Sequence, residues 1–195
     1  MKGVVTFVAI LVAASANAAA PLRDGDIIFQ TSRSGQSIAI QKATHSPYSH
    51  MGVILHREGK PFVFEAIATV RYTPLENWIA RGDGGRYVVR RLNRPLQPAE
   101  VVKLREAAKT YAGKPYDLYF EWTDARIYCS ELVWKMYRDA TGLEIGALQK
   151  LRELDLDDPA VIAKMRERYG KNIPLDERMI SPAAMYESRL LEVVR

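Results

Sequence analysis

The strongest constraint on the fold is a regular apolar stripe in the second half of the sequence. The stripe repeats at the spacing of one helical face and comprises Cys129, Leu132, Val133, Met136, Tyr137 and Ala140. Thr141-Gly142 then ends the pattern. A helix with an apolar face of this width must bury it against a second layer of structure.

The first half of the chain supplies candidate strands for that second layer. Residues 27–29 form a short apolar run after the Asp24-Gly25-Asp26 turn. Residues 50–55 and 62–66 are apolar runs joined by a connection that contains glycine, which predicts an antiparallel hairpin. Further strands are expected at 69–73 and 87–92.

Helical patterns dominate the rest of the chain, apart from an early weak helix at about 36–43. A short helix is expected around Trp78, and longer ones at 98–112 and 159–170, followed by a last turn at Ser181-Pro182 and a closing strand at 190–194. Antiparallel strands followed by helices predict an α+β class. The 195 residues contain no repeat or linker, so residues 21–195 are expected to form a single domain.

The N-terminus has the pattern of a secretory signal peptide. Lys2 precedes an apolar run at 4–14, and Ala16-Asn17-Ala18 is a small-residue cleavage site. We therefore predict a leader at residues 1–18, with cleavage near 18–20, and an exported, periplasmic protein. The alternative is a membrane anchor, but the apolar run is shorter than the ~20 residues of a spanning helix. No transmembrane segment is expected after cleavage.

Composition excludes several other classes of protein. Lys and Arg number 28 against 23 Asp and Glu, and the basic residues are scattered, which gives no argument for nucleic-acid binding. Several arginines between 81 and 94 form either a solvated basic face or a contact for an anionic polymer such as the cell wall. The single cysteine and three scattered histidines do not fit a zinc site, so no metal or cofactor is expected.

The single cysteine, Cys129, is the first candidate for chemistry. An unpaired thiol in an oxidising compartment is a liability unless it is buried or used. As part of the apolar stripe, Cys129 could be an ordinary core residue. It is also the first residue of the predicted helix, where free backbone N–H groups and the helix dipole favour a thiolate nucleophile. Both interpretations remain open from position alone.

A thiolate nucleophile needs a base and a group that orients it. His50 opens the first hairpin strand, at the rim of the predicted sheet, whereas His45 lies in a loop and His56 beside a turn. Glu65 ends the partner strand, where a buried carboxylate requires a hydrogen-bonding partner such as the His50 imidazole. The alternatives are a structural histidine and an edge-strand glutamate that reaches solvent.

Two tyrosines are candidates for contact with an oxyanion or with substrate. Tyr116 follows Gly113-Lys114-Pro115, shortly before the cysteine helix, and Tyr128 directly precedes Cys129. A tyrosine hydroxyl can stabilise a developing oxyanion together with the backbone N–H of Cys129. Simple packing of Tyr116 on a loop is the alternative.

The segments 113–116 and 128–133 resemble the Gly-x-Pro-Tyr and Cys-Ser-x-Leu-Val elements of the NlpC-type papain-like cysteine peptidases. Because the histidine segment precedes the cysteine here, the order resembles the circularly permuted YiiX/YebB-like branch of that group. Further matching segments are Gly25-Asp26-Ile27-Ile28-Phe29, Ser49-His50-Met51-Gly52-Val53, Phe64-Glu65-Ala66 and Ile180-Ser181-Pro182. The resemblance implies a permuted papain-like fold whose antiparallel sheet packs against the helix that bears the cysteine.

The resemblance also implies a chemistry. Cys129 would be the nucleophile, His50 the base, Glu65 the orienting acid and Tyr116 an oxyanion or substrate contact, in a hydrolase that cleaves amide bonds through an acyl-enzyme. The third residue in the wider group is often a polar residue other than Glu. Cell-wall peptides, including peptidoglycan, are the implied substrates.

Two other functions remain open. Relatives of this permuted fold handle lipid or fatty-acyl esters, so acyl transfer or ester hydrolysis at the same site is one alternative. The other is a binding module without turnover. The sequence specifies neither the oligomeric state nor the role of residues 143–182.

Overall fold

The computed structural model describes residues 20–194. The predicted leader at residues 1–18 lies outside the described residues. Within the described part, no helix combines the length and the hydropathy that crossing a bilayer requires.

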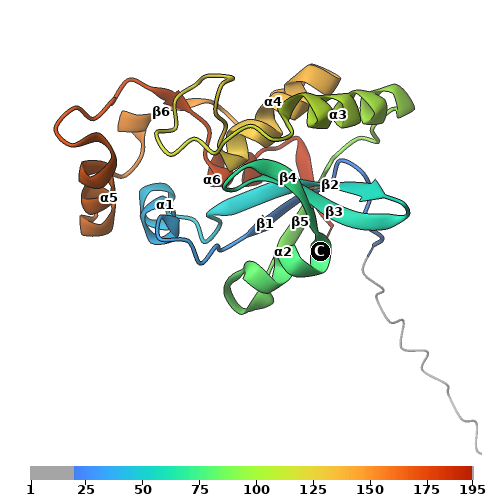
Figure 1. The fold of residues 1–195 in the computed structure, drawn as a ribbon, viewed down its shortest axis with the longest axis horizontal. Helices are drawn as coiled ribbons and strands as arrows, with labels where there is room; N and C mark the ends of the chain where they lie inside the picture. The colour runs from blue at the N-terminus through green and yellow to red at the C-terminus, as the bar shows by residue number, and fades with distance from the viewer. Residues whose placement is uncertain (1–19, 195) are drawn as a thin grey trace, which may run out of the picture.

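Six strands form one sheet in the order β4-β3-β2-β1-β5-β8, with every neighbouring pair antiparallel (Figure 1). Their bounds are β1 Ile27–Gln30, β2 His50–Arg57, β3 Lys60–Ala66, β4 Val70–Pro74, β5 Val88–Leu92 and β8 Leu191–Val193. The strands β6 (Gln149–Lys150) and β7 (Arg178–Met179) pair separately. The hairpin predicted from the apolar runs is present as β2 and β3.

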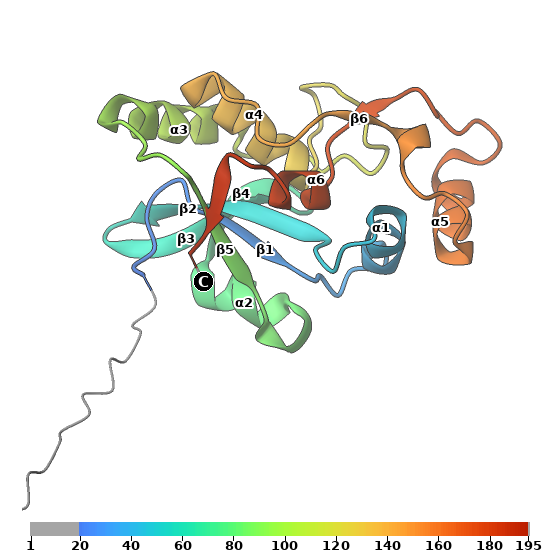
Figure 2. The same cartoon turned by 180° about the vertical axis from the view of Figure 1, so that it is seen from behind.

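Helices cover both faces and one end of the sheet. They are α1 Ser37–Thr44, α2 Leu75–Arg81, α3 Pro98–Tyr111, α4 Cys129–Thr141, α5 Pro159–Tyr169 and α6 Pro182–Tyr186, with short 3-10 turns at Asp83–Gly85 and Leu151–Glu153. Figures 1 and 2 show α3, α4 and α6 on one face, α2 on the other, and α1 with α5 at one end. This arrangement confirms the predicted α+β class.

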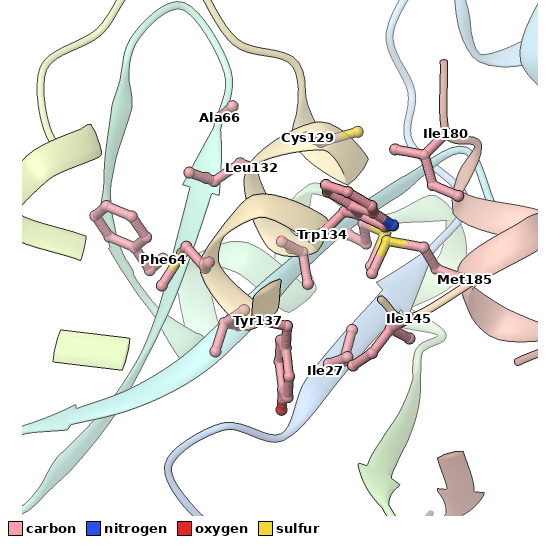
Figure 3. Close-up of a cluster of buried hydrophobic side chains, with 14 of the residues drawn as sticks. Ile27, Phe64, Ala66, Cys129, Leu132, Trp134, Tyr137, Ile145, Ile180 and Met185 are labelled. Carbon is pink, nitrogen blue, oxygen red and sulfur yellow. The ribbon is translucent and has the colours of Figure 1, made fainter. Parts of the chain in front are cut away.

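The apolar stripe of α4 packs on the sheet as its spacing predicts. Leu132, Val133 and Met136 are fully buried and belong to the main core cluster, together with Met51 and Val53 of β2 (Figure 3 shows part of this cluster). A second, smaller cluster fills the opposite face beneath α2. Burying each large apolar side chain stabilises the fold by roughly 1.5–3 kcal/mol, and this stabilisation holds α4 against β2.

One glycine in β2 is required by the close pairing of β2 and β3. A Cβ atom on Gly52 would lie 2.7 Å from the backbone oxygen of Phe64 and 3.3 Å from the Cβ atom of Glu65. Backbone cannot move aside as a flexible side chain can. Gly52 thus lets the strand carrying His50 lie close to the strand carrying Glu65.

Candidate active site

Cys129 occupies the first turn of α4, as its position in the stripe predicts. The Glu131 carboxylate accepts a hydrogen bond from the Tyr128 backbone N–H at 3.3 Å and caps this end of the helix. Figure 3 shows the Cys129 sulfur at the N-terminal end of α4, while Leu132 and Tyr137 follow along the helix into the core. Cys129 is only 3% exposed, yet it lines a small cavity, so burial and access to a ligand coexist.

His50 and Glu65 form a close pair at the end of the hairpin. His50 Nε2 lies 2.6 Å from Glu65 Oε2, and both side chains are buried. The β2–β3 register places Glu65 opposite Gly52, and the alternation of a strand puts His50 on the same face. The His50 ring stacks on Trp78 of α2, with centroids 6.1 Å apart. The ring is thus fixed from two sides.

Glu65 is held in its charged form by three donors. Thr73 Oγ1 donates to Glu65 Oε1 at 2.6 Å, and Arg81 Nη2 donates to the same oxygen at 2.5 Å. Burial raises the pKa of a carboxyl, but the hydrogen bonds from His50, Arg81 and Thr73 together lower the pKa of Glu65 to about 2. A negative carboxylate therefore faces the imidazole at every ordinary pH.

His50 in turn is set between Glu65 and Cys129. Burial lowers the pKa of this histidine, but hydrogen bonding and charge interactions with Cys129 and Glu65 outweigh it and raise the pKa to about 9. Because Nε2 is taken by Glu65, Nδ1 is the ring nitrogen available to the sulfur. The arrangement suits an imidazolium that lies beside the Cys129 side chain and can pass a proton to a leaving group.

Tyr116 is fixed beside the sulfur by backbone and side-chain contacts. Its N–H donates to Ala68 O at 3.1 Å, and its backbone pairs with Ile127, two residues before Cys129. Gln36 Nε2 donates to the Tyr116 hydroxyl at 2.9 Å, so the hydroxyl proton is left for another acceptor. Burial and the nearby Cys129 charge raise the pKa of Tyr116 well above its ordinary value. It is therefore a neutral donor.

The remaining sequence candidates lie in other contacts. The Tyr128 hydroxyl accepts a hydrogen bond from the Ile180 N–H at 3.1 Å and so ties the chain before α6 to the start of α4. His45 is exposed and lies 3.1 Å from Asp155, and His56 Nδ1 lies 2.8 Å from Asp24. The structure thus brings together Cys129, His50, Glu65 and Tyr116, whose catalytic roles stay predictions.

Two cavities meet at this cluster. A large cleft of about 1070 Å³ is lined by His50 and Tyr116, among other residues. A smaller cavity of about 70 Å³ lies beside Cys129 under mostly apolar side chains of α1, α5 and the chain before α6. Gln36, Lys164 and Arg168 line both cavities, so they mark the junction.

Sequence reasoning missed three residues of the site. Arg81 and Thr73 hold Glu65, and Gln36 holds Tyr116. Arg81 belongs to the arginines expected either on a solvated basic face or in contact with an anionic polymer, yet its side chain is bound to the buried carboxylate. A buried acid demands partners, and that requirement was the available signal for Arg81 and Thr73. No spacing in the sequence links Gln36 to Tyr116, which lies 80 residues away.

Comparisons with known proteins agree with this geometry. The model of a family described as "Permuted papain-like amidase enzyme, YaeF/YiiX, C92 family" matches residues 21–195. The Uncharacterized protein YiiX of Escherichia coli (strain K12) is 52% identical over 194 residues, which cover 100% of this chain and 96% of that protein. The crystal structure of metalloprotein yiiX from Escherichia coli O157:H7 has a TM-score of 0.87 at 55% identity, covering 89% of this chain and 96% of that chain.

The description of the second relative calls it a metalloprotein, which raises the question of metal ligands here. Within residues 20–194, His, Cys, Asp and Glu side chains do not gather in groups of three or more that could hold a metal ion. The Glu65 carboxylate and one nitrogen of His50 are already bonded to each other. A protein zinc site takes three or four ligands of these types.

Proposed function

The chain belongs to the YaeF/YiiX (C92) family of permuted papain-like amidase enzymes. We propose that it is an exported cysteine hydrolase that cleaves an amide bond in cell-wall peptides. The observation that carries the proposal is the position of the His50 imidazole. Its Nε2 lies 2.6 Å from Glu65 Oε2, and a hydrogen bond and charge interaction with Cys129 raise its pKa. Export rests on the leader pattern at residues 1–18, and the cell-wall substrate on the family resemblance.

The reaction begins with attack of the Cys129 thiolate on the amide carbonyl carbon. The carbonyl oxygen becomes an oxyanion, which the Cys129 backbone N–H and the Tyr116 hydroxyl stabilise. The N–H is suited to this role because the first N–H groups of a helix have no partner within the helix. Carbon–nitrogen bond cleavage is assisted by the His50 imidazolium, which gives its proton to the leaving amine.

The second half of the reaction releases the acyl group. Neutral His50 takes a proton from water, the resulting hydroxide attacks the thioester, and the Cys129 thiolate leaves. Glu65 keeps one ring nitrogen of His50 bonded, so the other nitrogen serves both proton transfers. Chain order has no influence on this chemistry, since a triad is defined by its geometry.

A fatty-acyl substrate is the second candidate, favoured by the apolar lining of the cavity beside Cys129. Its volume argues against a long chain, however. The cavity measures about 70 Å³, about half the volume of an engineered apolar cavity of about 150 Å³ that binds benzene. The small cavity therefore suits a side chain of a few carbons, and a fatty-acyl chain would not fit in this cavity alone.

The experiment compares acyl adducts on Cys129, the only cysteine, by intact-protein mass spectrometry. Wild type and His50→Ala are incubated with soluble peptidoglycan fragments or with fatty-acyl p-nitrophenyl esters. We expect a peptidyl adduct in the wild type and none in the variant. A fatty-acyl adduct alone would select the second candidate.

Thiol labelling separates an enzyme from a binding module. We expect iodoacetamide to label Cys129 well below neutrality in the wild type, and His50→Ala to lose this acidic reactivity. A thiol that reacts slowly and titrates near ~8.5 in both proteins, as an ordinary cysteine does, would refute the catalytic assignment and leave a binding module.

A further inference from the structure

The large cleft is lined by an excess of positive side chains. The lining residues include five cations, Arg33, Arg81, Arg126, Lys164 and Arg168, and one carboxylate, Glu167. Two of the cations are neutralised, since Arg81 pairs with Glu65 and Lys164 lies 2.5 Å from Glu167. Arg33, Arg126 and Arg168 form no ion pair with a carboxylate among the described residues.

This lack of carboxylate partners contrasts with the arginines between 81 and 94, for which the sequence offers contact with an anionic polymer as one alternative. Each of these five is held within the protein: Arg81 by Glu65, Arg86 by Asp83, Arg90 by the Tyr186 and Leu191 carbonyls, Arg91 by Asp26 and Arg94 by Glu100. Four of these arginines are neutralised by carboxylates, and in the described part of the chain Arg90 alone has only neutral carbonyl partners. The three arginines without a carboxylate partner that line the cleft are therefore its main source of unneutralised charge.

Arg168 is the best placed of the three unpaired arginines. Its guanidinium lies 4.8 Å from the centroid of the Phe120 ring and donates to Gln36 Oε1. Both partners are neutral, so they orient the guanidinium and leave its charge uncompensated. Gln36 is also the donor to Tyr116, which places Arg168 one side chain away from the predicted oxyanion contact.

α5 is the element that brings this charge to the site. Asp158 caps its start by accepting from the Ala160 N–H at 2.8 Å, and Arg168 lies in its last turn. α5 packs beside α1 (Figure 1), and Gln36 is the N-cap residue of α1. The sequence assigns no role to residues 143–182, and the structure places Lys164, Glu167 and Arg168 of their helix α5 in the lining of the cleft.

We propose that α5 is the substrate-selecting wall of the cleft, where Arg168, with Arg33 and Arg126 at the opening, binds an anionic group of the substrate close to the scissile bond. The proposal rests on the amide-hydrolase function above and names a feature of its substrate, a carboxylate or a phosphate. Arginine suits either group because its planar fork bonds two oxygens at once.

Two alkylating reagents of nearly equal size test the proposal on the single cysteine. Iodoacetate is anionic and iodoacetamide is neutral, and both form a carbon–sulfur bond at Cys129 with loss of iodide. The ratio of their rate constants cancels changes in thiol reactivity and reports the local potential. An excess of one charge sign in a cleft raises the local concentration of counter-ions by roughly 10- to 1000-fold. Arg168 supplies one of the three unpaired charges, so we expect Arg168→Gln to lower this ratio about two- to tenfold.

The control is Arg166→Gln, which removes the same charge from the same helix at an exposed position that lines neither cavity. We expect its ratio to equal that of the wild type, and Arg126→Gln to give a smaller decrease than Arg168→Gln. Equal ratios in all four proteins would overturn the anion site, as would equal decreases in Arg166→Gln and Arg168→Gln, which indicate net charge alone.

Competition then identifies the anion. Acetate and inorganic phosphate are added at equal ionic strength, and stronger slowing of iodoacetate by one of them assigns a carboxylate or a phosphate. If neither slows the reaction, the anion site is refuted. The hydrolase proposal is judged separately, because it depends on the His50 requirement for iodoacetamide labelling and not on the ratio.

Discussion

Replacing Glu65 with Gln measures how much of the charge on His50 depends on the buried carboxylate. The pKa of His50 rises from 6.5 to about 9, which corresponds to about 3 kcal/mol in favour of the imidazolium. Cys129 and Glu65 share this effect and also overcome the opposing effect of burial. We therefore expect Glu65→Gln to lower the His50 pKa by one unit or more, or at least about 1.4 kcal/mol.

The assay is a pH titration of the three histidine Cε1–H signals by NMR, with Glu76→Gln of α2 as an exposed control. Cys129→Ala should lower the His50 pKa as well. In Glu65→Gln/Cys129→Ala only burial remains, and the pKa should fall below 6.5. Titration of His50 near 6.5 in the wild type, or an unchanged pKa in Glu65→Gln, would refute the proposed electrostatics of the site.

The same pKa shifts define two pH windows of stability. A raised His50 pKa stabilises the folded protein fully below about 6.5, and this contribution is lost as the pH rises through about 9. A lowered Glu65 pKa stabilises it above about 4.5, and this contribution is lost as the pH falls toward about 2.

Three further predictions follow from the structure. Tyr116→Phe should slow acylation of Cys129 by p-nitrophenyl acetate about 10²-fold but leave alkylation by iodoacetamide unchanged, because alkylation forms no oxyanion. Tyr119→Phe is the control, and equal slowing of acylation and alkylation in Tyr116→Phe would argue against an oxyanion contact. Glu65→Ala should lower the unfolding free energy at pH 7 by ~3–5 kcal/mol, a deficit that shrinks as the pH falls toward 2, and a pH-independent deficit in urea unfolding would contradict the ionic origin. Gly52→Ala should cost more than ~2 kcal/mol in thermal unfolding because its Cβ would meet backbone, whereas Gly35→Ala, with open space around it, should cost less than ~1 kcal/mol.

The spacing of apolar and capping residues predicted those elements whose pattern lies within one short stretch of sequence. The α4 stripe, the β2–β3 hairpin and the capped start of α5 are each local patterns of apolar spacing or capping. The two-residue strands β6 and β7 were missed, since their pairing joins Gln149 to Met179 and has no local signal. The fold class and the permuted papain-like family are confirmed.

The sequence predicted those residues of the candidate site that have few alternatives in the chain, either of residue type or of hydrogen-bonding partner. Cys129 is the only cysteine, and a buried acid in a hairpin needs a partner such as His50. Gln36 could not be found in this way because its contacts with Tyr116 and Arg168 cross 80 and 132 residues. Long-range contacts between polar side chains depend on the packing of whole layers and leave no spacing in the sequence.

The proposed nucleophile and the proposed base belong to different layers of the protein, since Cys129 starts α4 and His50 starts β2. Their separation is therefore set by the thickness of the side chains between helix and sheet, among them Val53 and Leu132. A displacement of 1 Å in a reacting group can cost about 10²-fold in rate. Apolar residues that never touch substrate thus act as spacers for the reaction, and a one-carbon change in their length becomes a means of adjusting the rate.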